Sequence, residues 1–153
     1  MNEQNYTTTI TVDASPAEAY AAINDVRAWW GEDVEGPTDV LGAAFTFRGE
    51  NMHRSLIQVT ELVPGVRVVW RVLDNHLTFV DDQSEWVGTT ISFDILPTDG
   101  ASLIRFSHVG LLPGQECYDV CAPAWTFFVV DSLRALINSG AGRPLAKHPA
   151  RVA

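Results

Sequence analysis

Basic residues are scarce in this sequence. Of its 153 residues, 10 are lysine or arginine and 19 are aspartate or glutamate, so the formal net charge is −9 at pH 7. The phosphates of nucleic acids and the headgroups of anionic membranes attract proteins of the opposite charge. The composition therefore argues against nucleic acid and against anionic membrane surfaces as partners.

Long apolar runs are also missing. No stretch approaches the roughly eighteen consecutive apolar residues that a membrane-spanning helix needs. The opening segment, Met-Asn-Glu-Gln-Asn-Tyr, lacks the basic and apolar pattern of a signal peptide. We therefore expect no membrane span and a cytoplasmic location.

Cysteine occurs only at Cys117 and Cys121. On a continuous helix, side chains four residues apart lie on one face but point along the axis, which is a poor geometry for a disulfide. We interpret both cysteines as small buried apolar residues in a reducing compartment. A reactive thiol at a pocket mouth is the alternative, since a helix N-terminus lowers the pKa of a thiol.

Ligands for a metal or a cofactor are equally sparse. A structural zinc site needs about four ligands at partnered spacing. The histidines show no such spacing: His53, His76, His108 and His148. Gly140 and Gly142 follow a predicted helix, whereas the glycines of a phosphate-binding loop precede one. The sequence therefore predicts no metal and no cofactor.

What the sequence does contain is a series of segments that alternate between apolar and polar residues, as half-buried strands do. They predict strands over residues 6–12, 43–48, 53–62, 66–73, 77–81, 85–96 and 102–109. Most connections between these strands are short, which favours an antiparallel meander. In the last strand Ile104, Phe106 and His108 share one face, and we expect that face to be buried.

Two short helices are predicted after the first strand. The segment Ser-Pro-Ala-Glu combines an N-cap, a proline at the first helical position and a capping-box glutamate, which predicts a helix over residues 16–24. A second turn over residues 25–30 carries Trp29 and Trp30. Because neighbouring positions on a helix face different ways, we expect one tryptophan to pack inward and the other to cover an edge. A loop should follow as far as Gly42.

Residues 117–139 form the longest apolar segment and predict one helix with a narrow polar stripe. Such a helix must be covered on most sides. We expect Pro123 in its first turn, where a missing N–H costs nothing, whereas a deeper position would bend the helix. The predicted fold is therefore α+β, with a strongly curved antiparallel sheet wrapped around a long C-terminal helix.

Several short segments, taken in order, resemble a known family. They are Glu85-Trp-Val-Gly-Thr-Thr-Ile-Ser-Phe93, Phe106-Ser-His-Val-Gly-Leu111, Glu116-Cys-Tyr-Asp-Val-Cys121, Trp125 and Ser132-Leu-Arg-Ala-Leu-Ile-Asn-Ser-Gly-Ala-Gly-Arg-Pro144. With the order of elements, they resemble the START-like helix-grip superfamily, and more narrowly bacterial proteins similar to the activator of the ninety-kilodalton heat-shock chaperone ATPase. The resemblance covers roughly residues 5–145. Because no repeat or linker interrupts residues 5–139, we expect one domain over residues 1–145, and because periodicity is lost after the glycines and proline that end the helix, we expect residues 146–153 to be a flexible tail.

The resemblance also implies a cavity between the sheet and the last helix. From the strand alternation, its walls would be Phe45, Phe47, Val59, Trp70, Phe93, Phe106, Trp125 and Phe128, with Phe79 and Trp86 at the rim. Such walls suit an apolar or aromatic small molecule held by few polar contacts. The alternative for each of these side chains is that it only fills the core.

His108 is the predicted polar group of this cavity. A neutral imidazole can donate and accept hydrogen bonds, and it can transfer protons near neutral pH. His108 would then anchor a ligand or act as an acid or base, with Tyr118, Asp119 or Glu61 as candidates to orient it. A buried histidine with a purely structural role is the more common case.

Three functions remain open at this point. The first is a small soluble domain that binds an apolar or aromatic molecule, and the second is a cofactor-free enzyme resembling a polyketide cyclase or a hydrolase. The third is an accessory protein resembling a chaperone ATPase activator, although such activators add a separate N-terminal domain. A homodimer is an open alternative for the assembly.

Overall fold

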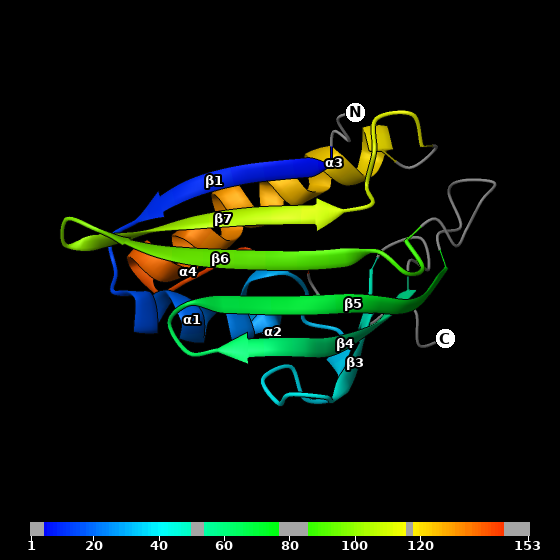
Figure 1. Ribbon diagram of the computed structural model, residues 1–153, viewed down its shortest axis with the longest axis horizontal. Helices are drawn as coiled ribbons and strands as arrows, with labels where there is room; N and C mark the ends of the chain where they lie inside the picture. The colour runs from blue at the N-terminus through cyan, green and yellow to red at the C-terminus, as the bar shows by residue number, and fades with distance from the viewer. Residues whose placement is uncertain (1–4, 50–53, 77–85, 116–117, 146–153) are drawn as a thin grey trace.

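The computed structural model describes residues 5–49, 54–76, 86–115 and 118–145, which share one hydrophobic core. Seven strands form an antiparallel sheet in the order β1-β7-β6-β5-β4-β3-β2 (Figure 1). The strands are β1 (Tyr6–Val12), β2 (Val34–Glu35), β3 (Ala44–Arg48), β4 (Arg54–Val63), β5 (Arg67–His76), β6 (Thr90–Thr98) and β7 (Ala101–Val109). The helices are α1 (Pro16–Asn24), α2 (Val26–Trp29), α3 (Tyr118–Thr126), the π-helix η2 (Phe127–Leu133) and α4 (Arg134–Ser139).

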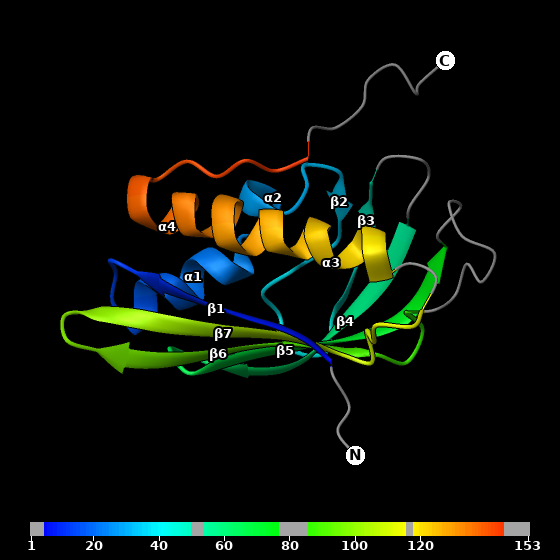
Figure 2. The same cartoon turned by 90° about the horizontal axis from the view of Figure 1, so that it is seen from above.

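The last three helical segments run end to end along one face of the sheet (Figure 2). Four of the apolar side chains that this helix buries recur every four residues, Cys121, Trp125, Val129 and Leu133, and Ala122 and Ser132 are buried beside them. Residues at this spacing lie on one helix face, so a single apolar stripe packs into the core. The predicted α+β helix-grip fold is confirmed.

The segment Tyr118–Ser139 is also the one helix in the described part of the chain that is long and apolar enough, by length and composition, to cross a membrane. The prediction from the sequence had found no apolar run of that kind. The core helix of a soluble protein has the same composition, because it buries a stripe of large side chains.

Along the central strands, alternate residues point to the inner face of the sheet, as the sequence predicted. Val68, Trp70 and Val72 in β5 are fully buried, as are Ile104 and Phe106 in β7. The outward positions of β5, β6 and β7 are exposed or half-buried and carry three arginines and an aspartate: Arg67, Arg71, Asp94 and Arg105. The two faces of the sheet are thus separated as a period-2 pattern requires.

Several predicted boundaries differ from the structure, and β5 ends at His76 and not at residue 73. The predicted loop before Gly42 contains β2, whose two residues are too few to produce an alternating signal. Strand β6 begins at Thr90 and not at residue 85, because residues 86–88 form a turn closed by the Thr89 N–H on the Trp86 carbonyl at 2.9 Å. The predicted strand over residues 77–81 and the tail 146–153 lie outside the described residues.

Pro123 lies inside α3, so the prediction that it occupies the first helical turn is wrong. The described helix already begins at Tyr118, and the missing N–H of Pro123 leaves the carbonyl of Asp119 without its helical partner. Because Asp119 is exposed, water can hydrogen-bond to that carbonyl. The helix continues past Pro123 and widens to π geometry from Phe127 onwards.

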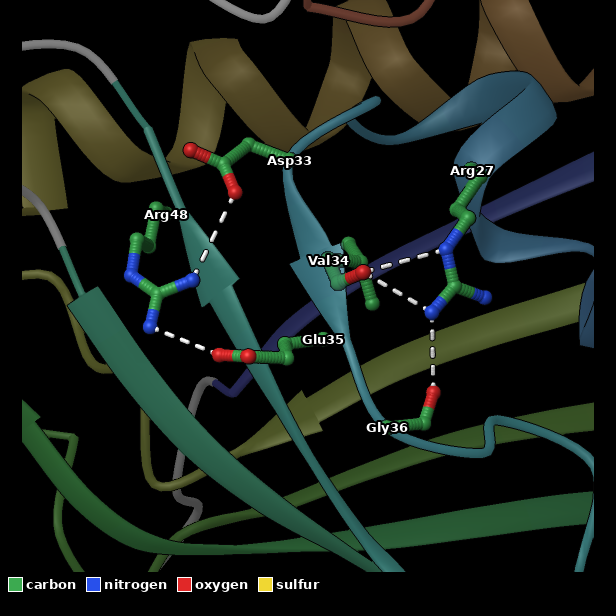
Figure 3. Close-up of polar contacts among 6 residues, drawn as sticks. All are labelled: Arg27, Asp33, Val34, Glu35, Gly36 and Arg48. Carbon is green, nitrogen blue, oxygen red and sulfur yellow. Dashed lines mark hydrogen bonds and ion pairs between the residues drawn. The ribbon is translucent and has the colours of Figure 1, made fainter. Parts of the chain in front are cut away.

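Two arginines hold β2 and its flanking residues from either side (Figure 3). Arg27 in α2 donates from Nε and Nη2 to the Val34 carbonyl at 3.0 and 2.8 Å, and from Nη2 to the Gly36 carbonyl at 2.9 Å. Arg48 in β3 forms ion pairs at 3.5 and 2.9 Å with two carboxylates, those of Asp33 and Glu35. These contacts fix the segment between α2 and β3 against the edge of the sheet.

Candidate functional site

The predicted cavity walls lie together in the interior, with one exception. The buried members, none more than 2% exposed, are Phe45, Phe47, Val59, Trp70, Phe93, Phe106 and Trp125. Phe128 is only half-buried and packs edge to face on exposed Phe127 at a centroid distance of 5.1 Å. Its position in the π-helix turns it toward the rim, so it belongs to the border of the core. Phe79 lies outside the described residues, and Trp86 is buried instead of lying at a rim.

The side chain at the centre of this group is Trp30, which was not among the predicted cavity walls. Its ring stacks on Phe47 at 4.0 Å and 11°, lies 4.8 Å from Trp125, and is parallel to Trp70 at 5.9 Å and 9°. Trp29 is buried as well, so the expectation that one of the two tryptophans covers an edge is wrong. Trp30 therefore lies between sheet and helix, where the sequence had predicted a ligand.

Several rings of this aromatic group are completely covered by other protein atoms. Phe45, Trp70, Phe93 and Phe106 have no accessible surface, and each makes ring contacts with its neighbours at 4.7–5.8 Å. Such contacts are typical of a close-packed interior. A molecule that lies against one of these four rings must displace a side chain.

His108 is fully buried on the inner face, where the alternation placed it. Its Nδ1 accepts a hydrogen bond from Trp125 Nε1 at 3.0 Å, and its Nε2 lies 2.8 Å from Thr89 Oγ1. The Thr89 hydroxyl donates its own proton to the Trp86 carbonyl at 2.6 Å, so Nε2 must be the donor to Thr89. The result is one continuous chain of hydrogen bonds that requires the neutral Nε2–H tautomer.

Protonation of His108 is disfavoured both by its burial and by its hydrogen-bond partners. Burial lowers the pKa of His108 from 6.5 to about 3, and a proton on Nδ1 would face the indole N–H of Trp125. Both nitrogens are engaged, and the partners are Trp125 and Thr89 and not the predicted Tyr118, Asp119 or Glu61. His108 has the geometry of a structural group and not of an acid or base.

Gly110 allows this arrangement at the end of β7. Its φ of +107° favours glycine, and a Cβ at this position would lie 2.6 Å from the Cγ2 of Thr89. The close approach keeps Thr89 against His108.

The remaining candidates for chemistry are few. Cys121 is a free, buried residue of the helix stripe, as the interpretation of a small apolar residue requires, and Cys117 lies outside the described residues. Within residues 5–49, 54–76, 86–115 and 118–145, no group of three or more histidine, cysteine, aspartate or glutamate side chains is placed to hold a metal ion.

Two surface grooves flank α1, away from the predicted cavity. One, of about 330 Å³, lies between α1 and α4 and has Asp13, Glu18 and Leu136 in its lining. The other, of about 520 Å³, lies between α1 and the segment after β2, with Tyr20 and Thr38 in its lining. Neither groove touches His108 or the aromatic cluster around Trp30.

The fold is similar to that of several solved structures. The Aha1 dimer from Colwellia psychrerythraea matches with a TM-score of 0.73 and 26% sequence identity, over 90% of this chain and 98% of that chain. DynU16, a protein of the dynemicin biosynthetic locus, matches with a TM-score of 0.68 and 16% identity, over 95% of this chain and 52% of that chain.

A protein from Staphylococcus saprophyticus matches with a TM-score of 0.65 and 12% identity, over 94% of this chain and 98% of that chain. At the identities of these last two structures, the likeness shows the fold alone. No protein-family model matches the sequence, and no curated protein matches it closely enough to carry an argument.

Proposed function

We propose that this member of the START-like helix-grip superfamily binds an apolar, planar small molecule between its sheet and its C-terminal helix. The observation that supports the proposal is the set of nearly parallel ring faces around Trp30, contributed by Phe47 and Trp70 of the sheet. Flat ring faces that enclose a flat side chain also suit a flat ligand of similar size.

Trp30 is the ring that such a ligand would replace. Trp29 donates its indole N–H to the Ile23 carbonyl at 3.1 Å, and Trp125 donates to His108 at 3.0 Å. The Trp30 side chain makes no hydrogen bond within the described residues and is held by ring contacts alone. Its rotation therefore breaks no hydrogen bond and exposes the faces of Phe47 and Trp125.

The test is a titration of the ¹⁵N-labelled protein with 2-methylnaphthalene, followed through its five indole N–H signals. We expect the signals of Trp30, Trp70 and Trp125 to shift with one saturating curve, because the ring of Trp30 leaves its place and the ligand then lies against the rings of Trp70 and Trp125. Saturable shifts of backbone amides beside α1 with unchanged indole signals, or no saturable shift at all, would contradict binding in the interior.

An enzyme on the same site receives less support. Acid or base catalysis needs a group with a free nitrogen or oxygen and a pKa near the working pH. His108 is the only titratable side chain among the buried polar residues of the described chain, and its pKa of about 3 and two occupied nitrogens do not suit that role. A cyclase or hydrolase would need a different group.

An accessory role toward a chaperone is the second candidate, supported by the likeness to Aha1 over nearly the full length of both chains. It would act through the surface, where Val120 and Phe127 are 54% and 40% exposed on the outer side of the helix. The test is the steady-state ATPase rate of a bacterial ninety-kilodalton chaperone with and without the protein. An unchanged rate at saturating protein would contradict this role.

The same outer face of the helix supports a homodimer, since the similar Aha1 structure is that of a dimer. When two copies assemble about a two-fold axis, exposed apolar side chains that meet there are removed from contact with water. Sedimentation should give a dimer mass that the variant Phe127→Glu converts to a monomer. A monomeric wild-type protein would contradict the proposal.

We further propose that the protein is soluble and cytoplasmic.

A further inference from the structure

Asn75 near the end of β5 has an unusual environment for a polar side chain. It is only 5% exposed, and neither its Oδ1 nor its Nδ2 has a hydrogen-bond partner within residues 5–49, 54–76, 86–115 and 118–145. Buried amides without partners destabilise a fold, so they are rare unless water or a ligand satisfies them. Asn24 also has an unpaired Oδ1, but its Nδ2 donates to the Tyr20 carbonyl at 3.0 Å. Among the described residues, Asn75 is therefore the buried side chain whose whole amide lacks a partner.

A β-bulge is the reason that Asn75 points inward. Leu56 pairs with Asp74 and Ile57 pairs with Val72, so Leu73 is an extra residue on β5. Without it, the alternation that buries Trp70 and Val72 would turn Asn75 toward solvent. Bulges often redirect a side chain next to a functional site. Here the bulge brings a free carboxamide to the inner face of the sheet.

The strand register connects this amide to the aromatic cluster. Asn75 lies directly opposite Ser55 in β4, which lies opposite Phe47 in β3. Opposite residues in an antiparallel sheet share a face, so the three side chains form one row, with Asn75 about 10 Å from Phe47. The Phe47 ring is the one on which Trp30 stacks at 4.0 Å.

The other buried polar groups restrict the chemistry of a ligand. The Trp70 Nε1 is a second buried donor on the same face of the sheet, and it too has no partner in the described part of the chain. His108 has no nitrogen left to offer. The buried polar residues of the described chain include no lysine, arginine, aspartate or glutamate. Since an unpaired charge is expensive to bury, the interior accepts a neutral ligand.

We propose that Asn75 is the polar anchor of the ligand site, and that the ligand is a neutral planar aromatic molecule whose polar group combines a donor and an acceptor, such as a carboxamide or a lactam. This inference rests on the proposed function. The aromatic part replaces the ring of Trp30 on Phe47, and the polar group pairs with both ends of the Asn75 amide. The bulge at Leu73 serves to present this amide.

Two probes of similar size test the anchor, 2-naphthamide and 2-methylnaphthalene. In the wild-type protein, calorimetry should give about tenfold tighter binding of the amide, as two added hydrogen bonds predict. Asn75→Leu keeps the side-chain size, and it should abolish this preference while raising the melting temperature by about 2–4 °C. Asn24→Leu removes a buried amide at the end of α1, away from the aromatic cluster around Trp30. It should leave the tenfold preference unchanged.

The outcomes separate the anchor from the proposed function. If both probes bind the wild-type protein and Asn75→Leu with the same ratio of affinities, interior binding stands and the anchor is wrong. If neither probe binds, the anchor and the proposed function both fail. If Asn75→Leu melts at a lower temperature and keeps the preference for the amide, Asn75 is a structural residue and the proposal is overturned.

Discussion

His108 and Asn75 are both buried polar residues on the inner face of the same sheet, and they differ in almost everything else. His108 in β7 uses both ring nitrogens, through Trp125 and Thr89, whereas Asn75 in β5 uses neither end of its amide. A buried group with all its partners stabilises the fold and has nothing to offer a ligand. A buried group without partners destabilises the fold, and a ligand can repair that loss.

The largest predicted effect comes from breaking the His108 chain at its aromatic end. Trp125→Ala removes a buried indole and leaves Nδ1 of His108 without its donor, so the free energy of unfolding should fall by about 3–5 kcal/mol. Urea denaturation measures this loss. Leu96→Ala in β6, a position that is 52% exposed, is the control and should change stability by under about 1 kcal/mol. Equal effects at both positions would contradict the packing described.

The second prediction concerns pH. Because the pKa of His108 is lowered from 6.5 to about 3, the unfolded chain binds a proton below pH 6.5 that the folded protein does not bind. Stability should therefore fall as the pH decreases from 6.5 toward 3. Between pH 6.5 and 5, the loss is about 2 kcal/mol.

The control for this pH effect is His108→Gln, which keeps hydrogen-bonding capacity but does not titrate. Its unfolding free energy should vary less than that of the wild-type protein over the same interval, although it is lower at pH 7. Parallel curves for the two proteins would mean that His108 is accessible to protons in the folded state.

A smaller effect is expected at Thr89, where Thr89→Val keeps the shape and removes the acceptor for Nε2 of His108. An N–H left unpaired in the interior should lower the unfolding free energy by about 1–2 kcal/mol. Asn75→Leu, which removes a polar group that is already unpaired, should have the opposite sign. If both substitutions destabilise the protein equally, the contrast between the two residues fails.

The same contrast explains what the sequence could predict. Strict alternation along β7 places Ile104, Phe106 and His108 on one face, and the structure confirms all three. Alternation along β5 holds only as far as Val72, because the bulge at Leu73 shifts the pattern by one residue. A bulge leaves no clear mark in a single sequence, so Asn75 could not be identified from the pattern.

The place of Trp30 at the centre of the aromatic cluster was not predicted, for a different reason. Trp30 follows the four-residue helix α2, where too few positions exist to define a buried face. Its burial depends on α2 packing against the long helix, and the segment is also tied to distant Leu145, whose N–H donates to the Trp30 carbonyl at 3.0 Å. Contacts between residues this far apart follow from the tertiary fold and not from local periodicity.

The most direct test of the central claim is a crystal structure of the protein with 2-naphthamide. We predict that the naphthalene ring lies on Phe47 and Trp125, that the Trp30 side chain has rotated away, and that the amide of the ligand lies within hydrogen-bond distance of Oδ1 and Nδ2 of Asn75. The hydrogen bonds of His108 should be unchanged. A ligand found in a groove beside α1, with Trp30 still stacked on Phe47 and Asn75 still unpaired, would contradict the account.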